Sequence, residues 1–212
     1  MSVIFFIFIT GKLPYIKQLI IMSRVTENRD LVFDKFPTIR TPHLELIQIT
    51  EAHAEDLYKL FGDSNVTRFY NLTPLECPDD AHRLIDHFRK RFESKAAIRW
   101  GIRLNDRKDI IGTVGFNNFT PKHRANIGYD LQYAYWNRGI CTEALHAIIS
   151  FGFHALNINR IESEVMEGNA SSIHLMHKIG FKHEGTLRDW MYWNNRHYDM
   201  LMFSLLRSDP HQ

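Results

Sequence analysis

The sequence predicts a mixed α/β fold, in which helices pack on one twisted β-sheet that contains both parallel and antiparallel strands. Two patterns predict it: several extended segments precede one strongly apolar helix, and strand, helix and strand segments follow that helix. The chain has 212 residues, of which 44% are hydrophobic and 24% charged. This size and composition fit one folded domain with an extension and exclude an intrinsically disordered protein.

A strand and two helices are predicted first. Alternating residues predict the strand over 44–49, and Thr50 offers an N-cap to a helix that ends near Gly62. The second helix begins with Pro78 and two acidic residues, which suit the positive end of a helix dipole. Its apolar residues recur at helical spacing and mark one face: Ala81, Leu84, Ile85, Phe88 and Phe92.

Strands and helices alternate along the rest of the chain. Gly180 suits the left-handed position that ends a short helix, and the polar residues 105–108 suit the turn of a hairpin. The predicted elements are strands at 98–104, 110–116 and 125–132, a helix at 142–156, a strand at 160–165, a helix at 171–179 and a last strand at 197–206.

The ends of the chain are predicted to lie outside the domain, which we place at 38–207 between an extension at 1–37 and a C-terminal tail at 208–212. The apolar run from Val3 to Thr10 is too short to span a bilayer, which needs about 20 residues. No positively charged segment precedes it, as a signal peptide would require. We interpret 1–21 as non-functional or as a misplaced start before Met22; a peripheral membrane anchor is the alternative.

Charge and cysteine content argue against several functions. The net charge is only +2 and no basic run with interleaved aromatic residues occurs, so neither nucleic acid nor stable membrane insertion is predicted. Cys77 and Cys141 are expected to be free thiols in a reducing cytoplasm. His174 and His177 lie three residues apart, but no third ligand at a recognised spacing accompanies them, so no metal site is predicted.

One loop carries a functional signal, the stretch from Trp136 to Ala144 between a strand and the apolar helix. A helix start presents backbone N–H groups without partners and a partial positive charge, both of which suit phosphate. Gly139 allows a sharp turn, and Arg138 adds a cation. Alone, these residues fit an anion site or an ordinary strand–helix turn equally well.

The surrounding motifs resemble the GCN5-related N-acetyltransferase (GNAT) superfamily, and in particular its ribosomal-protein N-terminal acetyltransferase branch. There the loop reads Gln or Arg, two residues, Gly, one residue, then Gly or Ala; here Trp136 occupies the leading position, Gly139 the glycine and Cys141 the small residue. We interpret Cys141 as a packing variant rather than a nucleophile. Further motifs of the branch follow in the same order: Thr41–Leu46, Trp100–Ile102, Ile111–Gly112, Ala125–Tyr129, Asn159–Glu162, Asn169–Ser172, Lys178–Phe181, Glu184–Asp189 and Asp199–Leu206.

The resemblance implies a GNAT fold, whose sheet splays at its centre, and acetyl-CoA as co-substrate. The pantetheine arm would follow the strand that ends near Leu131 and Tyr133, and the pyrophosphate would rest on the backbone amides from Arg138 to Thr142. Asn169 would bind the arm or cap its helix. The implied cofactor-binding residues are Leu131, Tyr133, Arg138, Gly139, Ile140, Cys141, Thr142, Asn169 and Ser172.

The residues that would move protons depart from the family pattern. The position of the usual Glu base holds Asn126, and Asp130, four residues later on the same strand face, is the candidate base. Its alternative role is that of a solvated acid at a strand end; Glu162 or Glu164 could hold a water instead. The position of the usual Tyr donor holds Met176, which leaves Ser172 as the candidate acid or as a helix-start hydroxyl.

The implied function is transfer of an acetyl group from acetyl-CoA to a primary amine, either a protein N-terminus or a small amine, in the cytoplasm. An antibiotic or polyamine acetyltransferase is one alternative, for which Asp63, Glu76, Asp79 and Asp80 could supply acidic pocket residues. A non-catalytic acyl-CoA sensor is the other. The resemblance also leaves a homodimer open. Aromatic residues lie either in the core or in the pocket: Phe69, Tyr70, Trp100, Trp190, Tyr192 and Trp193.

Overall fold

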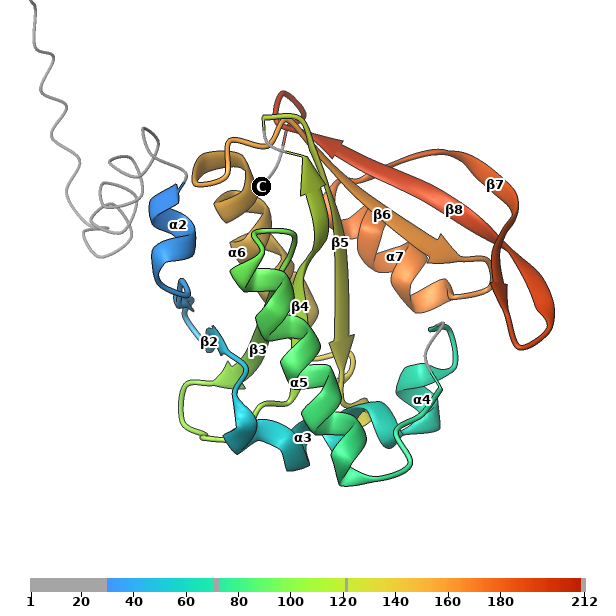
Figure 1. The fold of residues 1–212 in the computed structure, drawn as a ribbon. Helices are drawn as coiled ribbons and strands as arrows, with labels where there is room; N and C mark the ends of the chain where they lie inside the picture. Colours follow the sequence, from blue (N-terminus) through green and yellow to red (C-terminus); the bar gives the residue numbers. More distant parts are fainter. Residues whose placement is uncertain (1–29, 71–72, 121, 211–212) are drawn as a thin grey trace, which may run out of the picture.

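The predicted mixed α/β fold is confirmed. The computed structural model describes residues 30–70, 73–120 and 122–210. Figure 1 shows one twisted sheet, with α5 in front of it and α6 behind it. In these described ranges, eight strands lie in the order β1-β2-β3-β4-β5-β6-β8-β7, and only the β5–β6 pair is parallel.

The strands are β1 Ile39–Arg40, β2 Leu44–Gln48, β3 Ile98–Leu104, β4 Gly112–Thr120, β5 Arg124–Leu131, β6 Arg160–Met166, β7 Lys182–Trp193 and β8 Arg196–Leu206. The α-helices are α2 Asp30–Asp34, α3 Ala54–Gly62, α4 Ser64–Thr67, α5 Pro78–Glu93, α6 Ile140–His154 and α7 Ala170–Ile179. Two short turns of 3₁₀ helix complete the elements, η1 Glu51–His53 and η2 Tyr133–Tyr135.

The sheet splays between β5 and β6. These parallel strands pair only over Arg124–Asn126 and Arg160–Glu162, and beyond these residues they diverge (Figure 1). β5 stays paired with β4 as far as Leu131, while β6 stays paired with β8 as far as Met166. The divergence therefore leaves the inner edges of β5 and β6 without strand partners near the end of β5, next to the start of α6.

Two apolar clusters hold the layers together. The larger one packs α6, whose apolar residues occupy most of its circumference, against the strands, and it includes Trp100 and Phe151 in an edge-to-face contact with ring centroids 5.3 Å apart. The smaller one joins α3 and α5 through Leu57, Phe61 and Ile85. Helices thus cover both faces of the sheet, and side chains on its two faces lie in different surroundings.

The predicted extension lies only partly within the described residues. Residues 1–29, and with them the proposals for 1–21, fall outside. Val32 is buried, and Phe33 and Phe36 pack against Phe92 of α5. Within the described part of the chain, no helix is long and apolar enough to cross a membrane.

Candidate active site

The loop before α6 forms an open helix start. Asn137 and Gly139 both adopt left-handed conformations, with φ of 59° and 79°, and Gly139 is the N-cap of α6. A Cβ on Gly139 would meet no atom within 4 Å, so the backbone angle, and not lack of space, favours glycine. The first intrahelical bond runs from the Glu143 N–H to the Gly139 carbonyl at 3.0 Å. The preceding amides have no partner within the helix and are free to bind an anion.

Side chains on either side of the turn hold it in place. The Trp136 indole Nε1 donates to the Leu131 carbonyl at 2.8 Å, which ties the loop to the end of β5. In the first turn of α6, Glu143 accepts hydrogen bonds from the Thr41 hydroxyl at 2.5 Å and the His43 backbone at 2.9 Å. Although burial opposes the effect, these bonds hold the pKa of Glu143 below its usual value. These contacts tie the loop to β5 and the first turn of α6 to the segment before β2.

The predicted contacts around the turn differ in exposure. Arg138 is exposed, its guanidinium lies 5.4 Å from the Tyr135 ring centre, and it pairs with no carboxylate among the described residues. Tyr133 is 56% exposed. Burial raises the pKa of the Cys141 thiol to about 12, which keeps the thiol protonated and suits a packing role.

Across the splay, Asn169 and Ser172 lie at the start of α7. The Asn169 side chain accepts the Ser172 N–H at 3.2 Å and so caps the helix. The Ser172 hydroxyl lies 2.5 Å from the hydroxyl of Tyr129 on β5. Burial raises the pKa of the Tyr129 phenol well above its usual range, against the lowering effect of the bond to Ser172, so the phenol stays protonated. The protonated Tyr129 phenol is thus within hydrogen-bond distance of the Ser172 hydroxyl, where β5 and β6 diverge.

Asp130 is buried in a polar network on the opposite face of β5. It forms an ion pair with Arg99 of β3, and the Thr113 hydroxyl donates to its Oδ2 at 3.0 Å. The interpretation of Asp130 as a solvated strand-end acid is therefore wrong, because its side chain is buried, with a cation from β3 and a hydrogen-bond donor from β4 beside it. Burial raises the pKa of Asp130, against the lowering effects of Arg99 and Thr113.

The network extends from Asp130 to Asn126, the position of the missing glutamate. Arg99 donates to the Asn117 side-chain oxygen at 3.1 Å, and the Asn117 amide donates to Asn126 at 2.8 Å. Asp130 and Asn126 thus share both a strand face and a chain of hydrogen bonds. Sequence reasoning missed Arg99 and Asn117, which stand in no recognisable motif, and it used Tyr129 only as part of the Ala125–Tyr129 motif, without a role for its hydroxyl.

The other candidates have structural partners. Glu162 pairs with Arg160 at 2.6 Å, and Glu164 accepts a bond from the Trp190 indole at 3.3 Å. Trp100 is a fully buried core residue whose Nε1 donates to the Pro37 carbonyl at 2.6 Å. Among the described residues, no group of three or more His, Cys, Asp and Glu side chains could hold a metal ion.

The fold and the loop define an α/β enzyme domain of the acetyltransferase type, and the comparisons with known proteins agree. The model of the acetyltransferase (GNAT) domain family matches residues 43–182. The N-acetyltransferase YoaA of Bacillus subtilis (strain 168), whose own role is uncharacterised, is 39% identical over 173 residues, which span 81% of this chain and 98% of that protein.

Two further relatives have named activities or ligands. The ribosomal protein uS5-alanine N-acetyltransferase of Escherichia coli (strain K12) is 28% identical over 128 residues, 59% of this chain and 64% of that protein. The crystal structure of the microcin C7 self-immunity acetyltransferase MccE, in complex with acetyl-CoA and AMP, superposes with a TM-score of 0.70 at 24% identity, over 78% of this chain and 93% of that one. The chain belongs to the GNAT family and is an N-acetyltransferase.

Proposed function

We propose that this enzyme transfers an acetyl group from acetyl-CoA to a primary amine by direct attack of the amine on the thioester. One observation carries the proposal: the divergence of β5 from β6 lies between an open, anion-ready helix start and the Tyr129–Ser172 hydroxyl pair. The family membership adds the reaction type, and the acetyl-CoA seen with MccE adds the co-substrate.

The residues present fit acetyl-CoA. The amides from Arg138 to Thr142, which have no partner within α6, and the Arg138 guanidinium, which pairs with no carboxylate of the described residues, would hold the pyrophosphate. Leu131 and Tyr133 at the end of β5, together with Asn169 at the start of α7, would hold the pantetheine arm. Since Asn169 already caps α7, its side chain would serve both the helix and the co-substrate.

Ser172 would supply the proton that the leaving thiolate needs. When the acceptor nitrogen bonds to the acetyl carbon and the carbon–sulfur bond breaks, the Ser172 hydroxyl would give its proton to the sulfur. Tyr129 lies 2.5 Å from that hydroxyl and remains protonated, so its phenol would donate a hydrogen bond to the Ser172 oxygen as the serine proton leaves, and water would restore the proton on Ser172. The pair would replace the tyrosine that Met176, a fully buried core residue, cannot provide.

Asp130 is the proposed acceptor of the amine proton. The pKa rise that burial causes makes its carboxylate a stronger base, and the network links it to Asn126. An α-amine has a pKa near about 8 and is already partly neutral, so the demand on this base is small. In this proposal, the acidic limb of the pH–rate profile disappears in Asp130→Asn.

The test is release of free thiol from acetyl-CoA with a panel of peptides and small amines. Ser172→Ala should lower kcat by roughly a hundredfold with little change in acetyl-CoA affinity. Ser171→Ala is the matched control, because Ser171 is an exposed neighbour on the same helix. Tight acetyl-CoA binding with no thiol release on any acceptor would instead identify a sensor, and a normal rate in Ser172→Ala would remove the donor role.

A further inference from the structure

A cavity lies on the α5 side of the sheet, across β5 from the hydroxyl pair. Its volume is about 330 Å³, a size that suits a small ligand or one or two residues of a peptide end. Helix α5 supplies one wall and strands β3 and β4 supply the floor. Its lining residues are Phe61, Tyr70, Leu84, His87, Phe88, Arg91, Ala97, Arg99, Phe116 and Asn117.

The alternation of β5 connects this cavity with the reacting groups. Tyr129 faces α7 and Ser172, whereas Asn126 and Asp130 face the opposite side. There they meet Asn117 and Arg99, which are themselves lining residues of the cavity. A molecule in the cavity therefore approaches β5 from the side opposite the proposed proton donor.

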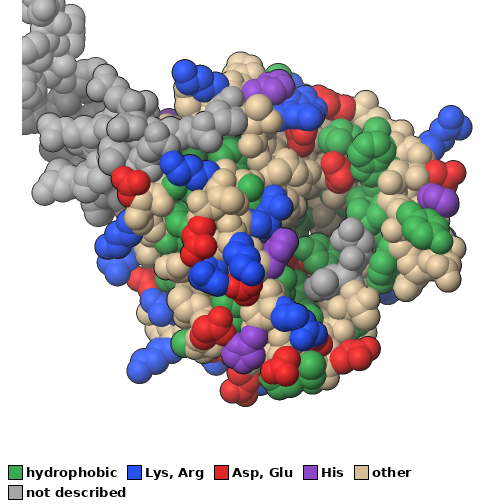
Figure 2. Space-filling view, in the orientation of Figure 1, with side chains coloured by type: hydrophobic (Ala, Val, Ile, Leu, Met, Phe, Trp, Pro, Cys, Tyr) green, Lys and Arg blue, Asp and Glu red, His purple; other side chains and the backbone are tan. Residues whose placement is uncertain are grey.

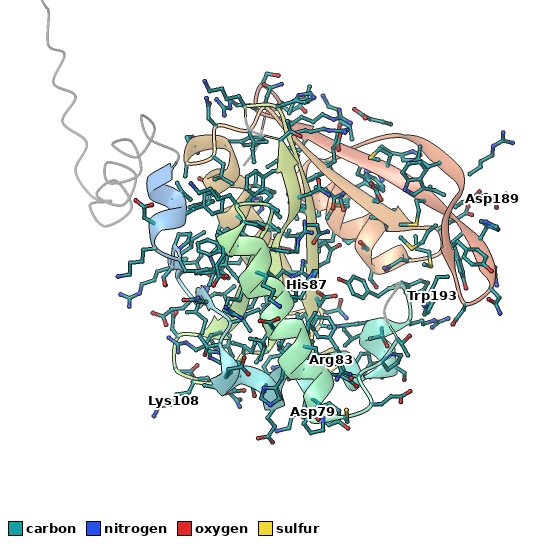
Figure 3. The ribbon with its side chains drawn as sticks, in the orientation of Figure 1. Asp79, Arg83, His87, Lys108, Asp189 and Trp193 are labelled. Atoms are coloured by element: carbon teal, nitrogen blue, oxygen red, sulfur yellow. The ribbon has the colours of Figure 1, made fainter. Side chains whose placement is uncertain are left out.

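The cavity combines apolar rings with positive charge. Its lining includes two arginines and no carboxylate. Arg99 is balanced by Asp130, but Arg91 pairs with no carboxylate among the described residues and donates only to the Asn117 backbone carbonyl, at 2.7 Å. One uncompensated cation thus borders an otherwise aromatic and aliphatic space. His87 of α5, labelled in Figure 3, adds a further hydrogen-bonding group.

None of the four acidic residues considered for a polycation lines the cavity, and two of them, Asp63 and Asp80, have partners of their own. Asp63 accepts the Asn65 backbone N–H at the start of α4. Asp80 accepts the backbone amides of Glu76 and Cys77 and pairs with Arg83. Figure 2 shows acidic and basic side chains interspersed over this face, without an acidic patch that would attract a polyamine.

We propose that the cavity binds the acceptor, and that the acceptor is a primary amine with an apolar body and a negatively charged group, a carboxylate or a phosphate, which pairs with Arg91. This inference rests on the proposed acetyl transfer and names the substrate class for it. The aromatic residues Phe61, Tyr70 and Phe88 hold the apolar body, and Arg91 holds the anion as a fork of N–H donors.

Matched acceptors test the charge preference directly. Aminoethylbenzoate and aminoethylbenzamide have the same shape and differ in charge, tyramine phosphate carries a phosphate, and spermidine is a polycation. Peptides that begin Ser-Glu and Ser-Gln extend the comparison to protein N-termini and distinguish a peptide source from a small-molecule source. We expect kcat/KM to be at least tenfold higher for the anionic member of at least one pair, and spermidine to be the poorest acceptor.

Variants of Arg91 test whether this residue causes the preference for anionic acceptors. Arg91→Gln should equalise kcat/KM for the two members of the favoured pair, through a loss of at least tenfold on the anionic member. Arg91→Glu should reverse the preference and improve spermidine. The control is Arg89→Gln, two residues away on α5, because Arg89 pairs with Asp86 and Glu93 and does not line the cavity. This control should retain the wild-type preference.

Failure of the inference and failure of the proposed function give different results. Equal rates for the charged and neutral members of every pair, or a preference for spermidine, would overturn the anionic acceptor while acetyl transfer stands. If the preference for anionic acceptors persists in Arg91→Gln, the proposal that Arg91 and this cavity cause the preference is wrong. Absence of thiol release with every acceptor would instead refute the proposed function itself.

Discussion

Replacement of Gly139 tests the phosphate site most directly, because two nearly isosteric side chains can be compared there. Both Asp and Asn tolerate the left-handed conformation that Gly139 adopts at φ 79°, and the Cβ of either meets no atom within 4 Å. The backbone strain, about 1 kcal/mol, is therefore common to both variants. Only the Asp variant adds a negative charge beside the amides that would hold the pyrophosphate.

The magnitude follows from Coulomb's law. At a separation of about 4 Å, a carboxylate and one phosphate charge repel by about 1 kcal/mol in bulk water and about 4 kcal/mol at the effective dielectric constant of a protein surface. Gly139 is exposed, so its surroundings fall between these limits. We expect Gly139→Asp to bind acetyl-CoA roughly 5- to 700-fold more weakly than Gly139→Asn.

Isothermal titration of coenzyme A into both variants measures the difference, and thermal unfolding without ligand confirms that both fold alike. Because the Gly139 site is exposed, the gap between the Asp and Asn variants should narrow as salt is raised. Affinities within a factor of about three at low salt, with both proteins folded, would refute the assignment of the phosphate to this helix start.

Three further variants address the hydroxyl pair, the hydrogen bond that ties the loop to β5, and the ion pair between β6 and β7. Tyr129→Phe should lower kcat roughly tenfold and leave the KM for acetyl-CoA unchanged. In a Ser172→Ala background the same change should have little further effect on kcat, because the two hydroxyls act together. Additive losses in the double variant would contradict this coupling. Trp136→Phe removes one hydrogen bond to β5 and should cost about 1 kcal/mol of unfolding free energy, so an unchanged melting temperature would argue that the bond contributes nothing. Hydrogen bonding to Arg160 lowers the pKa of Glu184 to about 2. The stability that this ion pair contributes is present above the unfolded pKa of about 4.3 and is lost as the pH falls toward 2. Because the Glu184 side chain is 41% exposed, this loss is about 1 kcal/mol or less. In urea titrations between these pH values, Glu184→Gln should not show the loss.

The helix start was predictable because its signal is local. A glycine, a neighbouring cation and an apolar helix stand within ten residues, and the structure places Gly139 at the N-cap. The splayed sheet was also predictable, but only through the ordered motifs of the family. Nothing in the residues of β5 or β6 alone indicates that their pairing ends after Asn126 and Glu162.

The groups around the reaction were harder to predict because they meet across long stretches of chain. Tyr129 and Ser172 are 43 residues apart, and Arg99 and Asp130 are 31 apart. Their contacts depend on strand register and on the placement of α7, neither of which sequence spacing defines. Asp130 was identified from its position four residues after Asn126, but its burial and its ion pair follow only from the packing of β3 and β4.

The two faces of β5 explain how one strand can serve both halves of the reaction. Tyr129 points to α7 and Ser172, and its neighbour Asp130 points to Arg99, which lines the cavity under α5. Gly128 leaves room on the cavity face: a Cβ there would come within 2.9 Å of the Arg99 guanidinium and of the Asn117 amide. A side chain at this position would make the ends of the Arg99 and Asn117 side chains shift, and so disturb the network that joins Asn126 to Asp130. A register shift of one residue would exchange the two faces, so the pairing of β5 with β4 controls both proton donation and acceptor recognition.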